Sequence, residues 1–179
     1  MYISPYLLGN MEFKGIIQQL ENNNSVFENL LKNKTENQYL WRPKPEKWCL
    51  LEIIGHLLDE EIYDFRASVK HALEHPTQPL VPINPEGWVT EHQYISRDYN
   101  QTLQLFLEER TISIKWLKMQ TDVNWNSSLT HPDLGELSAG FFLRNWLAHD
   151  YLHIRQILNY QYGFFKSTSD IDLSYAGSW

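Results

Sequence analysis

The sequence predicts an all-α protein built as a four-helix bundle. Four long segments carry apolar residues at the three- and four-residue spacing of a helix face, and no segment shows sustained strand alternation. Prolines and clusters of turn-forming residues separate these segments and interrupt helices. Four helices of this length, each with one apolar face, bury those faces most simply against one another.

The first helix is expected at about residues 10–33, and a connection with two prolines follows at 41–48. The second is expected at about residues 49–74 because large aliphatic and aromatic residues recur along one face. The apolar positions that define these two helices are Phe13, Ile16, Ile17, Leu20, Phe27, Leu30, Leu31, Leu50, Ile53, Ile54, Leu57, Leu58, Ile62 and Phe65.

Prolines 76, 79, 82 and 85 then predict an extended crossing of about ten residues. The third helix is expected at about residues 90–119, a loop at 120–136, and the fourth helix at about 137–161. The tail, residues 163–179, is expected to be non-helical. We interpret residues 1–179 as a single domain, because no linker or repeat divides them.

Composition excludes several classes of protein. The net charge of −7, with Lys and Arg dispersed, argues against nucleic acid as the main partner. No apolar stretch is long enough to span a bilayer, so no membrane partner is expected. The N-terminus lacks the features of a signal peptide, and the single cysteine, Cys49, excludes an intrachain disulfide. We therefore expect a cytoplasmic protein.

His149 and His153 are the strongest chemical signal. Their spacing places both imidazoles on one face of the fourth helix, one turn apart, where they can bind one divalent cation. A second pair, His71 and His75, lies just before Pro76, where the helix should end. We interpret that pair as capping the helix or facing the negative end of its dipole.

A catalytic metal normally has three protein ligands, so a third residue is needed. Asp150 completes a His-Asp-x-x-His pattern close to that of zinc peptidases, but only 26 residues follow His153, and their carboxylates are Asp170 and Asp172. We therefore do not favour a peptidase and expect the ligand upstream. His56, in the middle of the second helix, is the best candidate; the alternative is a core histidine hydrogen-bonded to Glu60.

Two motifs then resemble a known family. Residues 47–61, KWCLLEIIGHLLDEE, resemble the second-helix signature of the DinB-like superfamily, and residues 149–157, HDYLHIRQI, resemble its fourth-helix signature. Segments 76–88 and 131–135 also fall where that family places them, and the resemblance covers about residues 10–162. The layout is most similar to the bacillithiol S-transferase-like branch.

The resemblance implies a DinB-type four-helix bundle that holds one divalent metal ion, usually zinc or nickel, on His56, His149 and His153. Water or substrate would complete the coordination. The family commonly has Ser or Thr where this chain has Cys49, three residues before Glu52, so the helix cap is altered. Cys49 is either a small buried replacement for serine or a nucleophile activated by the helix N-terminus.

Residues behind the ligands are less well defined. Glu60, Asn145 and Gln156 each lie within one turn of a predicted ligand and could orient its ring or contact a substrate. Asp150 points about 100° away from His149 around the helix, so we expect it to make a salt link or to cap a neighbour, and not to act as the base.

Three imidazoles leave a divalent ion with an open face, which lowers the pKa of a bound thiol or water. The leading hypothesis is transfer of a low-molecular-weight thiol to an electrophilic small-molecule substrate. A hydrolase that uses metal-bound hydroxide and a non-catalytic metal- or ligand-binding bundle are the alternatives. As for the oligomeric state, a homodimer is one possibility, because bundles can pair through an exposed helix face.

Overall fold

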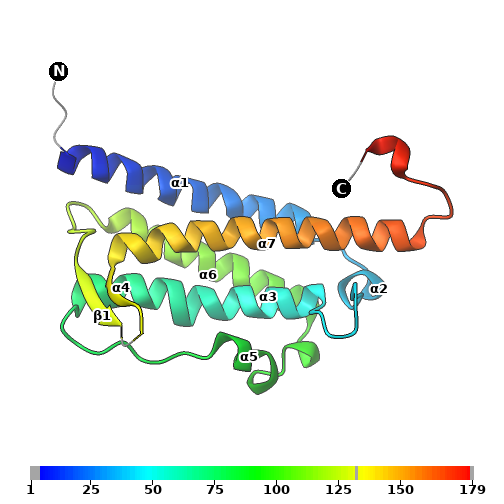
Figure 1. Ribbon diagram of the computed structural model, residues 1–179, viewed down its shortest axis with the longest axis horizontal. Coiled ribbons are helices and arrows are strands. Elements are labelled where there is room, and N and C mark those ends of the chain that lie inside the picture. Colours follow the sequence, from blue (N-terminus) through cyan, green and yellow to red (C-terminus); the bar gives the residue numbers. More distant parts are fainter. Residues whose placement is uncertain (1–4, 132, 178–179) are drawn as a thin grey trace.

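The computed structural model describes residues 5–131 and 133–177, and of residues 5–11 the backbone alone. Four long helical elements run along the molecule (Figure 1). They are α1 (Pro5–Leu31), the continuous run of α3 (Leu50–Asp59) and α4 (Arg66–Glu74), α6 (Tyr99–Met119) and α7 (Ala139–Thr168). Helix α1 packs on α6 and α7, and α3 packs on α6. The predicted four-helix bundle is confirmed.

A π-helical segment, Glu60–Phe65, joins α3 to α4 without a break, so the predicted second helix is one run with a local widening. Cys49 is the N-cap of α3, and the Glu52 side chain accepts a hydrogen bond from the Cys49 backbone N–H at 2.8 Å. The capping box therefore forms with a thiol in the usual place of serine. A π-turn inside an α-helix often marks a functional site, and this one directly follows the helix that carries His56.

The third predicted helix begins too early. A separate helix, α5 (Pro85–Glu91), follows the extended crossing, with Asn84 capping it through the Gly87 N–H. Gln93 then adopts φ 48°, in the left-handed region, and a 3₁₀ turn at Tyr94–Ser96 precedes α6. Because a left-handed residue cannot continue a helix, α6 starts only after Asp98, which caps the Gln101 N–H.

The predicted loop 120–136 holds most of a short hairpin, which continues through residues 137–138, so the fourth helix begins at Ala139 and not at 137 as predicted. Strands β1 (Ser128–His131) and β2 (Gly135–Ser138) pair antiparallel, with Leu129 opposite Leu137. Both leucines are buried against the end of the bundle. Each strand has only four residues, too few for strand alternation to be visible in the sequence.

The fourth helix is longer than predicted, because α7 continues to Thr168 and only then does the chain leave helical geometry. The expected non-helical tail is therefore wrong for residues 163–168. Farther along the tail a 3₁₀ turn lies at Ser174–Ala176, and residues 178–179 lie outside the described residues.

Near the other end of the chain, the short helix α2 (Glu36–Tyr39) follows α1.

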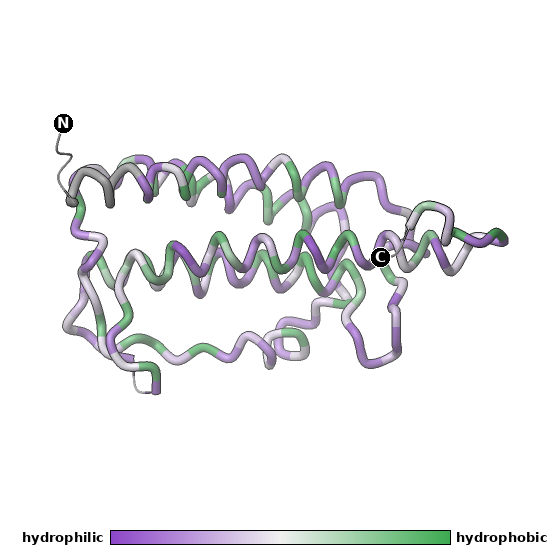
Figure 2. The backbone as a smooth tube through the Cα atoms, turned by 45° about the horizontal axis from the view of Figure 1, so that its top comes forward, coloured by the Kyte–Doolittle hydropathy of each residue, from purple (hydrophilic) through white to green (hydrophobic). Residues whose placement is uncertain are grey.

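Two apolar clusters make up the core, and a buried polar layer lies between them. Along α1, Leu20 belongs to one cluster and Phe27 to the other, and along α6 the same is true of Ile114 and Phe106. Hydrophobic and hydrophilic positions alternate along the helices in Figure 2, as expected of elements with one apolar face. Within residues 5–131 and 133–177, no helix has the combination of length and apolarity that a membrane crossing requires.

Candidate metal centre

The fold brings together the three histidines that the sequence singled out. His56 comes from α3, and His149 and His153 come from successive turns of α7. The Nε2 atom of His149 lies 3.2 Å from Nε2 of His56 and 3.1 Å from Nε2 of His153. A tetrahedral ion with nitrogen ligands at its usual bond length holds them about 3.3 Å apart. The arrangement therefore fits a single cation, and these three form a group that could hold one.

All three rings are in an environment that favours their neutral form. Burial, together with the nearby His153, lowers the pKa of His56 to about 3. Burial and the neighbouring histidines lower the pKa of His149 to about 2, and burial also lowers the pKa of His153. Imidazole must be deprotonated to bind a metal, so the rings are already in the binding form at neutral pH.

The second ring nitrogens indicate which way the lone pairs face. His153 Nδ1 lies 2.8 Å from Gln156 Oε1, and since an amide oxygen only accepts, Nδ1 carries the proton. Nε2 of His153 then presents its lone pair toward His149. Lone pairs that face one another in a buried space repel unless a proton or a cation lies between them.

His56 is supported from behind by a carboxyl group. Its Nδ1 is buried without a hydrogen-bond partner, and Oε1 of Glu60 lies 3.7 Å from it. Burial, with further contributions from Asp64 and Asp59, raises the pKa of Glu60 to about 8. A histidine that binds a metal commonly donates its other N–H to a carboxylate, and Glu60 is placed for that role.

Aromatic rings flank the histidines. The Trp48 ring centroid lies 5.0 Å from that of His56, and the Phe65 centroid lies 5.0 Å from that of His149. Phe65 is 8% exposed. These rings keep water from the sides of the imidazoles, which strengthens electrostatic interactions at the Nε2 atoms.

Of the three residues predicted to lie behind the ligands, two lie beside a histidine ring and one does not. Gln156 contacts His153, and Glu60 lies beside His56, as expected. Asn145 is different: it is exposed, and its amide donates to the Phe141 carbonyl at 2.9 Å and not to the His149 ring, so contact with a substrate stays a prediction for it. Asn145 lies four residues before His149, but its side chain bonds back along its own helix.

Asp150 and Cys49 take the structural roles. Asp150 is fully buried and forms a salt link with Arg110, as predicted, and is not placed as a base. Cys49 is also fully buried, and burial raises the pKa of its thiol. The reading of Cys49 as a small buried residue is therefore favoured over that of an activated nucleophile.

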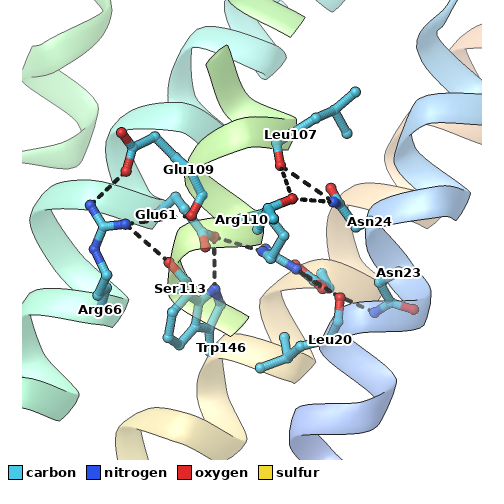
Figure 3. A network of polar contacts seen from close by, with 12 residues as sticks. Leu20, Asn23, Asn24, Glu61, Arg66, Leu107, Glu109, Arg110, Ser113 and Trp146 are labelled. Carbon is cyan, nitrogen blue, oxygen red and sulfur yellow. Dashed lines mark hydrogen bonds and ion pairs between the residues drawn. The ribbon is translucent and has the colours of Figure 1, made fainter. Parts of the chain in front are cut away.

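The sequence does not identify the residues that join Asp150 in the buried polar layer beside the histidines, which are Asn23, Glu61 and Arg110. Figure 3 shows Arg110 at the centre of these contacts. A signal was present, because Arg110 lies four residues from both Phe106 and Ile114 and so interrupts the apolar stripe of α6. A charged residue on a buried face requires a buried partner.

Two other features lie apart from the histidine centre. A groove of about 630 Å³ runs between α4, α5 and residues 80–84, and none of the three histidines lines it. His71 donates to the Gln78 carbonyl at 2.9 Å, which lies beyond the end of α4, so the predicted capping role of the pair His71 and His75 stays a prediction. Their ring centroids are 6.2 Å apart.

Comparisons with known proteins agree with this fold. The structure of YfiT from Bacillus subtilis, described as a probable metal-dependent hydrolase with an unusual four-helix bundle topology, superposes with a TM-score of 0.74. The two sequences are 20% identical, and the match covers 89% of this chain and 88% of that chain. No curated protein matches the chain in sequence. Residues 19–157 match the DinB superfamily, and the chain therefore belongs to the DinB superfamily.

Proposed function

We propose that the protein is a metal-dependent enzyme whose metal ion is held by His56, His149 and His153. The observation that carries this proposal is the convergence of three neutral Nε2 atoms at 3.1 and 3.2 Å. A divalent ion bound there would lower the pKa of a thiol or water that it binds. We propose zinc or nickel, because imidazole suits both.

The reaction that we propose is transfer of a low-molecular-weight thiol to an electrophilic small molecule, as in the bacillithiol S-transferase-like branch that the sequence layout resembles. The state of Cys49 supports a thiol that comes from a cosubstrate. Because Cys49 is fully buried and its pKa is raised, the chain offers no thiolate of its own.

The residues around the centre each have a defined task in this proposal. Gln156 holds His153 with Nδ1 protonated, so that Nε2 stays available. Glu60 lies beside Nδ1 of His56, where a carboxyl oxygen can accept a hydrogen bond from the Nδ1–H group. Trp48 and Phe65 flank the rings and exclude water from their sides. Among the described residues, no cysteine sulfur or carboxylate oxygen joins the three nitrogens, so further positions are left for thiol, water or substrate.

Hydrolysis is the second candidate, and the likeness to YfiT supports it, because that protein is described as a probable metal-dependent hydrolase. Against it, neither of the two carboxyl groups described beside the ligands is placed as a base. Asp150 is bound by Arg110, and Glu60 lies on the Nδ1 side of His56, away from Nε2. A bundle that binds metal without turnover is the remaining alternative.

Metal analysis of purified, untagged protein tests the shared site. We expect about one equivalent of metal in the parent and its loss in both His56→Ala and His149→Ala. His75→Ala is the matched control, because His75 is exposed at the end of α4. This variant should bind as much metal as the parent. A parent that binds neither zinc nor nickel after reconstitution would overturn the proposal.

Activity assays with the reconstituted protein then separate the reactions. Consumption of bacillithiol or cysteine with a chlorodinitrobenzene, lost in His149→Ala, would support thiol transfer. Cleavage of a nitrophenyl ester without any thiol, lost in the same variant, would support hydrolysis instead. A metal-loaded parent that performs neither reaction, but is stabilised by its metal, would favour the non-catalytic bundle.

A further inference from the structure

The helix that carries His56 packs on α7 mainly through its later part, α4, and much less through α3, the part in which His56 lies. The other main neighbour of α7 is α1. His149 and His153 are held at a constant spacing by α7 itself, but the distance from them to His56 depends on how two separate helices are held. A metal site needs its ligands within about 0.5 Å of their productive positions, so another contact has to set this registry.

Arg110 of α6 makes that contact. Its Nη1 and Nη2 donate to the two carboxylate oxygens of Asp150 on α7, at 2.7 and 2.8 Å. Its Nε donates to Oε2 of Glu61 at 2.8 Å, in the π-helical segment that directly follows α3. The same Glu61 oxygen accepts from Nε1 of Trp146 on α7 at 3.1 Å (Figure 3). Asn23 of α1 donates to Asp150 at 3.0 Å.

The position of these contacts relative to the ligands is the decisive point. Trp146 and Asp150 lie on either side of His149 along α7, and Glu61 lies five residues after His56 on the same continuous helix. The guanidinium of Arg110 therefore links two residues, Glu61 and Asp150, that lie close in sequence to metal ligands on two different helices. Arg110 and Glu61 are each 1% exposed and Asp150 is fully buried, so water cannot substitute for these bonds.

We propose that Arg110 is a positioning residue that sets the distance between His56 and the pair His149 and His153. This inference rests on the metal site proposed above and goes beyond it, because Arg110 touches none of the three rings through a hydrogen bond. Only arginine can do this, since a planar guanidinium with donors on three nitrogens reaches two carboxylates at once. Lysine keeps the charge but loses that geometry.

The test makes the same Arg→Lys substitution at two positions of the protein and compares the two variants. Arg110→Lys should bind Co²⁺ and Zn²⁺ about 10–100-fold more weakly than the parent and should shift the visible absorption of bound Co²⁺. Arg66→Lys is the matched control, because Arg66 of α4 pairs with Glu109 of α6 at 2.7 Å but adjoins no ligand. Ile114→Ala, one turn along α6, controls for lost packing. Both controls should match the parent in affinity and spectrum.

The outcomes separate this inference from the proposed function. If Arg110→Lys binds metal with the parent's affinity and spectrum, Arg110 has only a structural role and the inference fails, while the metal site stands. If the parent binds no metal, both fail. Should Arg110→Lys not fold, Asp150→Asn replaces it, because that change removes the charge that the guanidinium grips and keeps the side-chain shape. The same loss of affinity is then required.

Discussion

Replacing His149 by glutamine should remove a defined part of the acid sensitivity of the metal-free protein. An ordinary histidine has a pKa of about 6.5, and burial lowers that of His149 to about 2. Below pH 6.5 the unfolded chain therefore takes up a proton on this ring that the folded protein does not bind. The free energy of unfolding falls as the pH falls through this window, and glutamine has no proton to take up.

The magnitude follows from proton linkage. Integrated from pH 7 to pH 5, one such histidine removes about 2 kcal/mol of stability. Glu60 acts in the opposite direction: with a pKa raised to about 8, it holds a proton in the folded state that the unfolded chain releases. The stability that Glu60 contributes is full at low pH and is lost as the pH rises toward 8. In the parent, the opposite contributions of His149 and Glu60 to the unfolding free energy partly cancel as the pH changes. The difference in unfolding free energy between the parent and His149→Gln leaves out the contribution of Glu60, which both proteins share.

Urea denaturation at pH 7, 6 and 5, in the presence of a chelator and followed by tryptophan fluorescence, measures this difference. The gap in unfolding free energy between parent and His149→Gln should change by about 2 kcal/mol across the series, in favour of the variant at pH 5. Ile114→Ala is the control, because it removes packing without any proton and should lower stability equally at each pH. Parallel curves for parent and His149→Gln would refute the conclusion that this ring is buried in its neutral form.

Three further outcomes follow from single contacts. Gly55→Ala should lower the unfolding free energy by about 1–3 kcal/mol in urea denaturation, because a Cβ there would lie 2.7 Å from the Tyr94 ring; unchanged stability would contradict that close approach. Gln156→Ala should weaken zinc binding about 10-fold in a chelator competition, since His153 loses its acceptor; equal affinity would show that this bond does not orient the ring. Cys49 should react with a thiol reagent only on unfolding, and Cys49→Ser should keep its metal, whereas rapid labelling of the native protein would argue against a buried thiol.

The number and course of the long helices could be predicted because each shows its apolar face at local spacing. Their ends were harder. Gly163 is typical of a helix end, yet α7 continues through it. A Cβ at Gly163 would lie 2.7 Å from the Trp41 ring, so this glycine serves a close approach between distant segments and not a helix stop. Gln93, in contrast, lies just after the end of α5 and has a left-handed backbone conformation, which its residue type does not predict.

By itself, the sequence determined that His149 and His153 share one helix face, since four residues span one turn of any α-helix. It also identified His56 as a histidine on a buried stripe that needs a partner. Only the tertiary structure decided that Nε2 of His56 lies 3.2 Å from Nε2 of His149, and that Arg110 links Glu61 to Asp150 beside them. The physical reason is that helix periodicity is a local property of the chain, whereas the distance between helices depends on side chains far apart in sequence.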